Sequence, residues 1–168
     1  MNDRIAISHA EFKEVCDNEN CRANSQHFRP LEHEQIWRIS ASVRELLLLP
    51  LYPVWYLGAT GGDFRHSHDP AYNRILFRDA LERDDFRSEC LEDRHPTSQI
   101  TIPTNLIGLH CTTCGNFALI DGNHRLTRLA LGLIEPGLNA QVILSVLSGS
   151  RWGDDVPDMN KVCACLAP

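Results

Sequence analysis

The chain has 168 residues, 43% of them hydrophobic, so it is long enough and apolar enough to bury a core as one domain. Its 22 acidic and 16 basic residues give a net charge of −6, which provides no general attraction to nucleic acid or to an anionic membrane. No apolar run approaches the roughly 20 residues of a membrane span, and the N-terminus lacks the apolar stretch of a signal peptide. We therefore expect a cytoplasmic protein without a membrane partner, with a toxin delivered without a cleaved signal as a less favoured alternative.

The first 50 residues carry two helical patterns. Ser8 and Glu11 have the spacing of a capping box, which predicts that a short helix begins here. A second helix is expected to run up to Pro50, because apolar residues recur there at intervals of three and four. These apolar residues are Ile36, Ile39, Val43, Leu46 and Leu47. Residues 1–50 are therefore predicted to form an N-terminal helical extension.

A strand and a glycine-rich loop are expected next. Residues 51–57 are rich in aromatic and β-branched side chains, and Pro53 indicates an edge strand or the start of a strand. The loop of residues 58–69 contains three glycines and two histidines, so it could form a wall of a ligand site or be an ordinary surface loop. His66 and His68 could also bind a metal ion.

One helix is expected after this loop. Asp69 is a good N-cap residue, and Pro70 is tolerated at the first helical position. The apolar spacing continues this helix to about Arg83. The segment 84–95 is strongly charged and is expected to be an exposed excursion.

Several short strands are predicted in the second half of the chain. Their residue ranges are 99–102, 106–109, 117–120 and 139–144. The second and third of these flank the sequence Cys-x-x-Cys-Gly, so they are expected to form a β-hairpin whose turn contains Cys111 and Cys114. The last strand follows a break at residues 135–137.

The hydrophobic pattern changes its period within residues 116–132. An apolar run of strand length gives way to the spacing of a helix. The residues that would line one face of this helix are Leu126, Leu129, Ala130 and Leu133. A strand that passes through an Asp-Gly turn into a helix leaves backbone N–H groups unpaired at the helix start, where an anion can bind.

Polar side chains stand at this predicted turn. Arg125 offers a planar set of donors that matches phosphate or carboxylate, and His124 can donate, accept or shuttle a proton near neutral pH. The alternative is that Gly122 is simply a turn glycine and that both side chains are ordinary polar residues of a helix start.

The segment Asp121-Gly-Asn-His-Arg-Leu126 lies between an apolar strand and a helix containing Ala130 and Gly132, and it resembles the signature segment of the ParB/sulfiredoxin superfamily. The resemblance covers about residues 51–147. It implies an α/β (α+β) domain with a small mixed sheet, whose Gly-x-x-Arg turn binds nucleotide phosphates. By this resemblance the catalytic residues are Asp121, His124 and Arg125. The nucleotide-binding residues are Gly122, Asn123, His124 and Arg125, with Asn73, Arg74 and Arg78 from the preceding helix.

The resemblance argues against sulfiredoxin activity itself. In that family the reactive cysteine lies between the glycine and the His-Arg pair of the motif, and this chain has Asn123 there. Parental ParB proteins add a helical DNA-binding domain, and we expect none in the C-terminal tail of residues 148–168. Partition-type DNA binding is therefore not predicted.

The seven cysteines form an odd number in a chain without an export signal, so we expect reduced thiols or metal ligands. Cys-x-x-Cys-Gly at a hairpin turn has the form of a zinc knuckle. Four cysteines could close one structural zinc site and hold the tail against the hairpin. They are Cys111, Cys114, Cys163 and Cys165. A redox pair and inert thiols are the alternatives.

Three functions follow from this turn. The first is a phosphotransferase or nucleotide hydrolase that uses ATP or another nucleotide with Mg²⁺ and an unidentified small-molecule acceptor. Arg125 would bind phosphate, His124 would orient or protonate the reacting group, and Asp121 would bind a metal ion or accept a proton. The second is a ParB-like nuclease, which the acidic net charge disfavours. The third is a non-enzymatic module that binds a nucleotide or zinc. The oligomeric state is left open.

Overall fold

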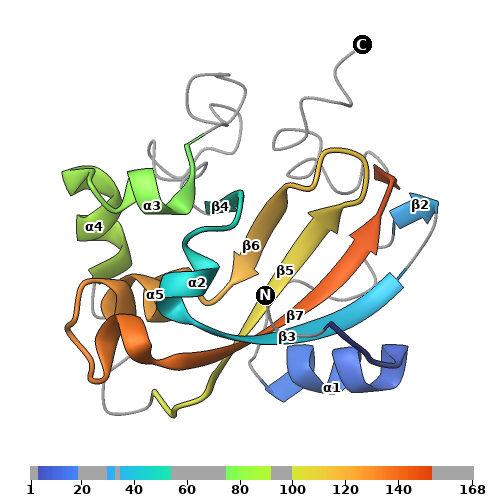
Figure 1. The fold of residues 1–168 in the computed structure, drawn as a ribbon, viewed down its shortest axis with the longest axis horizontal. Coiled ribbons are helices and arrows are strands. Elements are labelled where there is room, and N and C mark those ends of the chain that lie inside the picture. The colour runs from blue at the N-terminus through green and yellow to red at the C-terminus, as the bar shows by residue number, and fades with distance from the viewer. Residues whose placement is uncertain (1–3, 19–29, 33–34, 54–74, 92–99, 153–168) are drawn as a thin grey trace.

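The computed structural model describes residues 4–18, 30–32, 35–53, 75–91 and 100–152 (Figure 1). Its strands are β1 (Ile5–Ala6), β2 (Pro30–Glu32), β3 (Gln35–Ser42), β4 (Leu51–Pro53), β5 (Thr104–Cys111), β6 (Phe117–Asp121), β7 (Gln141–Gly149) and β8 (Arg151–Trp152). Its helices are α1 (His9–Asn18), α2 (Val43–Leu46), α3 (Phe77–Ala80), α4 (Asp84–Leu91), α5 (Asn123–Ala130) and the 3₁₀ helix η5 (Gly137–Asn139).

A six-stranded mixed sheet in the order β1-β3-β7-β5-β6-β4 forms the centre of the fold. The pairs β3/β7 and β5/β6 are antiparallel, whereas β5/β7 and β4/β6 are parallel. Strands β2 and β8 pair separately. The predicted mixed α/β fold is thereby confirmed. Of the two positions predicted for Pro53, an edge strand and the start of a strand, the first is confirmed, because β4 is the last strand of the sheet that the described residues form.

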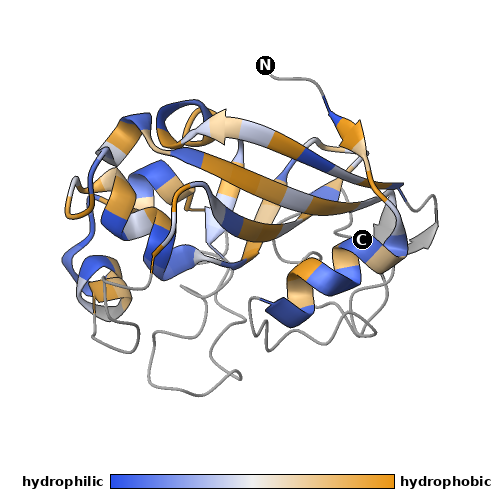
Figure 2. Ribbon diagram, turned by 90° about the horizontal axis from the view of Figure 1, so that it is seen from below, coloured by the Kyte–Doolittle hydropathy of each residue, from blue (hydrophilic) through white to orange (hydrophobic). Residues whose placement is uncertain are grey.

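Helices pack on both faces of this sheet. One hydrophobic core contains side chains from α2, α3, α4 and α5, and a smaller one contains Phe12 and Cys16 of α1. In Figure 1, α2 to α5 gather at the left end of the sheet and α1 lies below its right part. Hydrophobic colour dominates the central strands in Figure 2, as expected for strands covered on both faces.

The N-terminal region confirms one prediction and contradicts another. Helix α1 begins with the predicted capping box, in which Ser8 N–H donates to Glu11 Oε2 over 2.7 Å and Glu11 N–H donates to Ser8 Oγ over 3.2 Å. The helix predicted between Pro30 and Pro50 is wrong for most of its length, since residues 35–42 form strand β3 and, of the described residues in this range, Val43–Leu46 alone are helical.

Strand β3 shows why the helical pattern was misleading. Burial alternates along it, with Trp37, Ile39 and Ala41 buried and the residues between them exposed. This is the period of two that a strand requires. A second capping box marks the true helix start. Ser42 Oγ accepts the Glu45 N–H, and the Glu45 side chain accepts the Ser42 N–H. The strand then lies beside β7 along its whole length.

The segment after residue 75 also differs from the prediction. The part of the predicted helix that precedes residue 75 lies outside the described residues, and α3 begins only at Phe77. The charged segment 84–95 was expected to be exposed, yet Asp84–Leu91 is helix α4, with Phe86 and Cys90 buried in the main core. These two residues are one helical turn apart, which lets an otherwise charged helix pack on one edge.

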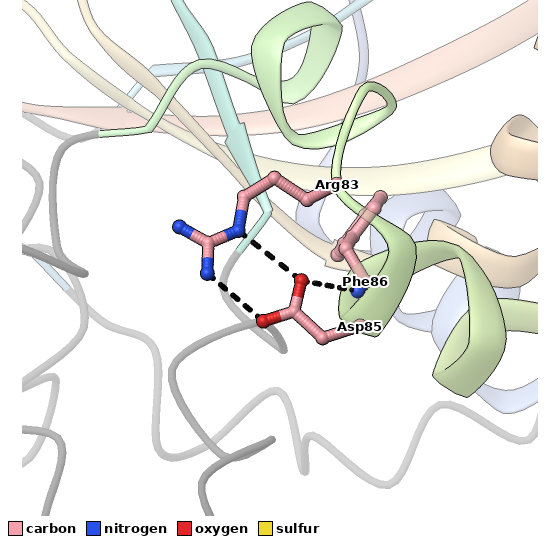
Figure 3. A network of polar contacts seen from close by, with 3 residues as sticks. All are labelled: Arg83, Asp85 and Phe86. Carbon is pink, nitrogen blue, oxygen red and sulfur yellow. Dashed lines mark hydrogen bonds and ion pairs between the residues drawn. The ribbon is translucent and has the colours of Figure 1, made fainter.

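A small polar network fixes the start of α4. Figure 3 shows Arg83 beside the carboxylate of Asp85, with distances of 3.1 Å from Nε to Oδ1 and 2.9 Å from Nη2 to Oδ2. The same Oδ1 accepts the backbone N–H of Phe86 over 2.8 Å. Asp85 thus accepts an N–H group in the first turn of α4, a position that favours negative charge.

The second half of the chain follows the prediction more closely. Strands β5 and β6 form the expected hairpin, and β6 leads into α5 as predicted. Ile100 to Ile102 are not a strand, although this was expected. Helix α5 also ends before Leu133, whose side chain is 57% exposed, so this residue does not belong to the buried face.

Candidate functional site

The strand-to-helix turn is built on Gly122, between β6 and α5. Its φ of 99° lies in the left-handed region, which side chains other than glycine rarely adopt. A Cβ at this position would also collide with the side chain of Leu106, which is fully buried beneath the turn. Two independent constraints, backbone conformation and packing, therefore require glycine here.

Asp121 and Arg125 face each other across this turn. The Arg125 Nη2 forms an ion pair with Asp121 Oδ2, and the two side chains are 19% and 29% exposed, respectively. An atom placed at the Cβ position of Gly122 would lie 3.6 Å from Arg125 Nη2, so the guanidinium lies over the glycine. The structure thus brings three of the predicted site residues together in a position that is only partly shielded from solvent.

His124 is held by helix α4. Its Nδ1 lies 2.8 Å from the backbone carbonyl oxygen of Cys90. Because a carbonyl oxygen only accepts, Nδ1 must carry the hydrogen, and in the neutral ring the lone pair is then on Nε2. The sequence could not reveal this contact between His124 and the Cys90 carbonyl. A backbone group has no signature in the sequence, and α4 itself was not predicted.

The inner face of α5 contains two polar atoms that have no hydrogen-bond partner among the residues that the structure describes. Asn123 is 3% exposed, and its Nδ2 donates to the Leu119 carbonyl oxygen over 3.3 Å, but its Oδ1 has no hydrogen-bond partner. Thr127, one turn later, is fully buried, and its Oγ1 also lacks a partner. Buried polar atoms are normally hydrogen-bonded, so this face of α5 has unused capacity to accept a donor or a cation.

Apolar packing holds the turn in a fixed position. Leu126 and Leu129 of α5 are fully buried in the main core. The backbone of α5 connects back to the turn, because the Leu126 N–H donates to the Gly122 carbonyl oxygen over 2.8 Å. Side chains that project from a helix anchored in this way keep a defined geometry, which a binding or catalytic site requires.

Of the other predicted nucleotide contacts, Arg78 lies in the described part of the chain, and no contact to the turn is recorded for it there. Arg78 lies in α3 with its side chain 51% exposed, and its described ion pair joins its Nε to Asp79 Oδ1 over 3.6 Å. Asn73 and Arg74 lie outside the described residues, as do His66 and His68. The described part of the site therefore consists of the turn and α5, with the carbonyl from α4.

The hairpin cysteines differ in their surroundings. Cys111 is fully buried in the small core beneath α1, whereas Cys114 is exposed at the turn. Gly115, the residue after Cys114, has a φ of 77°, which lies in the left-handed region that favours glycine. Cys163 and Cys165 lie outside the described residues, and the described ranges contain no group of three or more metal-ligating side chains. Zinc binding stays a prediction.

A second polar cluster lies at the opposite end of β6. Ser148 Oγ accepts the Trp37 indole N–H over 2.7 Å and lies 3.0 Å from His110 Nδ1. The His110 ring contacts Phe117 and Trp37, with centroid distances of 4.5 and 5.6 Å. Burial lowers the pKa of His110 to about 4, and the positive charge of Arg4, which lies over the Trp37 ring, contributes to the decrease.

Comparisons with models of protein families, with curated proteins and with solved structures gave no match to this chain. Among the described residues, no helix has the length and apolar character needed to cross a membrane. Functional conclusions therefore rest on the residues of the chain itself.

Proposed function

We propose that this protein is a nucleotide-dependent phosphotransferase of the ParB/sulfiredoxin type, which transfers a phosphoryl group from a nucleotide to a small-molecule acceptor. The observation that supports it best is the turn at Gly122, where a required glycine precedes the helix whose first turn carries His124 and Arg125. The resemblance of residues 121–126 to the superfamily signature supports the same class.

Phosphate binding at this turn would use two kinds of donors. The first backbone N–H groups of a helix have no partner within the helix, and the helix dipole favours an anion beside them. Arg125 adds a guanidinium, which can bind two phosphate oxygens at once. Gly122 is suited to such a site, because its left-handed backbone joins β6 directly to α5 and so brings these N–H groups to the end of the strand.

The chemistry proposed for His124 follows from its tautomer. A hydroxyl oxygen of the acceptor attacks the terminal phosphorus, and the bond from that phosphorus to the bridging oxygen breaks, which leaves the nucleoside diphosphate. The proton of the hydroxyl passes to Nε2 of the neutral His124, while Nδ1–H stays bonded to the Cys90 carbonyl. When bound, Mg²⁺ would neutralise phosphate charge, and Asp121 is the carboxylate that could hold it.

Thermal unfolding with nucleotides tests the binding site. The wild-type protein, Arg125→Ala and the control Arg44→Ala would be heated with ATP, CTP, GTP or ADP, with and without Mg²⁺. Arg44 is an exposed arginine of α2. A ligand at a hundredfold excess over its dissociation constant stabilises the folded state by roughly 2.7 kcal/mol. We expect at least one nucleotide to stabilise the wild type and the control but not Arg125→Ala.

Turnover separates the enzyme from the other functions. We expect the wild type to release nucleoside diphosphate only when a small-molecule acceptor is present. His124→Ala should lose this release but still bind the nucleotide. Nucleotide binding without turnover would favour a binding module. If no nucleotide stabilises the wild type, the phosphotransferase is wrong, and cleavage of DNA becomes the next activity to measure.

A further inference from the structure

We propose that Asp121 occupies the phosphate position on Arg125 when no nucleotide is bound, and that the incoming phosphate displaces it and frees its carboxylate for the Mg²⁺ that accompanies the nucleotide. This inference rests on the proposed function. It adds a coupling between the two ligands. Phosphate would bind Arg125 and so release Asp121, whereas Mg²⁺ would bind Asp121 and so release Arg125.

The ion pair has the accessibility that an exchange requires. Both side chains are mostly covered, with 19% of Arg125 and 29% of Asp121 exposed, yet neither is closed off from solvent. Pairs in such surroundings are less screened than pairs on an open surface. The guanidinium lies over Gly122 at the start of α5, which is where the backbone donors of the helix would bind a phosphate.

The two anions compete for one nitrogen of Arg125. Its Nη2 is paired with Asp121 Oδ2 and is also the nitrogen that lies over Gly122, so a phosphate at the start of α5 that bonds Nη2 competes with Asp121 for it. The displaced carboxylate is then a partly buried charge without its cation, which is unfavourable. A divalent cation removes this cost, since carboxylate oxygens are ligands that Mg²⁺ prefers.

Asn123, the residue after Gly122, carries a buried acceptor. Among the described residues its Oδ1 has no hydrogen-bond partner, although its Nδ2 donates to the Leu119 carbonyl oxygen. An amide oxygen is also a ligand for a hard cation. The first residue of α5 thus has an unused oxygen, and Asp121 would lose its ion pair with Arg125 when phosphate takes Nη2.

Calorimetric binding of ATP with and without Mg²⁺ tests the exchange. The proteins are the wild type, Asp121→Asn and the control Asp17→Asn, which breaks another i, i+4 ion pair, between Lys13 and Asp17 on exposed α1. Coupling between ligands typically changes affinity by 5- to 150-fold, so we expect Mg²⁺ to tighten ATP binding about tenfold in the wild type and the control. In Asp121→Asn, ATP without Mg²⁺ should bind about tenfold more tightly than to the wild type, with little further effect of Mg²⁺.

Two results would overturn the exchange in different ways. If Asp121→Asn binds Mg²⁺-free ATP no more tightly than the wild type does, Asp121 does not compete for Arg125, and the proposed function stands without it. If the wild type binds no nucleotide, both proposals fail. Asp121→Ser is a second neutral variant, and it replaces Asp121→Asn in this measurement if the latter fails to fold.

Discussion

A histidine whose Nδ1 is hydrogen-bonded lies near each end of strand β6, His110 in β5 opposite Phe117 and His124 in α5 just after Asp121, yet their surroundings differ. His124 bonds the Cys90 carbonyl and is partly exposed at a helix start, while His110 bonds Ser148 and is 7% exposed among aromatic rings. The two ends are separated by four residues of β6, or roughly 13 Å at 3.3 Å per residue. One sheet thus carries a polar group suited to a ligand and another suited to internal packing.

What separates the two histidines is access and charge. His110 is kept neutral by burial, and its hydroxyl partner is itself fully buried. His124 lies beside an arginine, an aspartate and a helix start, which are groups that bind anions and metal ions. We therefore expect substitutions near His110 to change stability, and substitutions near His124 to change ligand binding, with one exception at the glycine.

That exception is Gly122→Ala, for which we expect the largest loss of stability. A side chain at positive φ costs about 1–3 kcal/mol, and overpacking against Leu106 adds a similar amount. The matched control is Gly132→Ala, which also has positive φ, 69°, but nothing within 4 Å of its Cβ position. Urea unfolding should show a clearly larger loss for Gly122→Ala. Equal losses would mean that packing at the turn is unimportant.

The pH dependence of stability should reveal His110. Its pKa is about 4 in the folded protein against 6.5 as the ordinary value, so the unfolded chain binds the proton more readily between these two pH values. Its contribution should be constant above pH 6.5, and stability should fall as the pH decreases towards 4, by about 3 kcal/mol in total. The difference between wild type and His110→Phe, measured by urea unfolding from pH 7.5 to 4.5, isolates this effect. Parallel curves would contradict it.

Substitution of two serines of β7 should change stability by a smaller amount, and one of the two serves as the control for the other. Ser148 and Ser145 are both fully buried, but Ser148 accepts the Trp37 indole N–H whereas Ser145 Oγ has no partner. Ser148→Ala leaves a buried donor unsatisfied and should destabilise the protein by about 1–3 kcal/mol. Ser145→Ala removes an unsatisfied hydroxyl and should change the free energy of unfolding by less than about 0.5 kcal/mol. A reversed order would show that the Trp37 bond contributes little.

The parts of the fold that were predictable from sequence carry local signals. The turn at Gly122 combines a change of hydrophobic period with a glycine, the hairpin combines two apolar runs with a Cys-x-x-Cys-Gly turn, and the capping box is given by the spacing of Ser8 and Glu11. The same signals locate Asp121, Gly122 and Arg125, because residues within one helical turn of each other are necessarily close in space.

The parts that were not predictable depend on partners distant in sequence. Strand β3 contains apolar residues at both helical and alternating intervals, and its pairing with the distant strand β7, from Gln35 with Ser148 to Ser42 with Gln141, decides between them. The sequence of helix α4 is mostly polar and charged, and Phe86 and Cys90 are its two described side chains in the main core. Its carbonyl contact to His124 depends on this packing, so no local pattern could reveal it.

Backbone amide chemical shifts during titration with ATP would test most directly whether the turn at Gly122 binds nucleotide phosphates. Adenosine is the control ligand, because it carries the base and the sugar without any phosphate. We expect the amide resonances of residues 122–125 to move with ATP and Mg²⁺, to move little with adenosine, and to stay unchanged with ATP in Arg125→Ala. Shifts confined to other parts of the chain, or equal shifts with adenosine, would contradict phosphate binding at this turn.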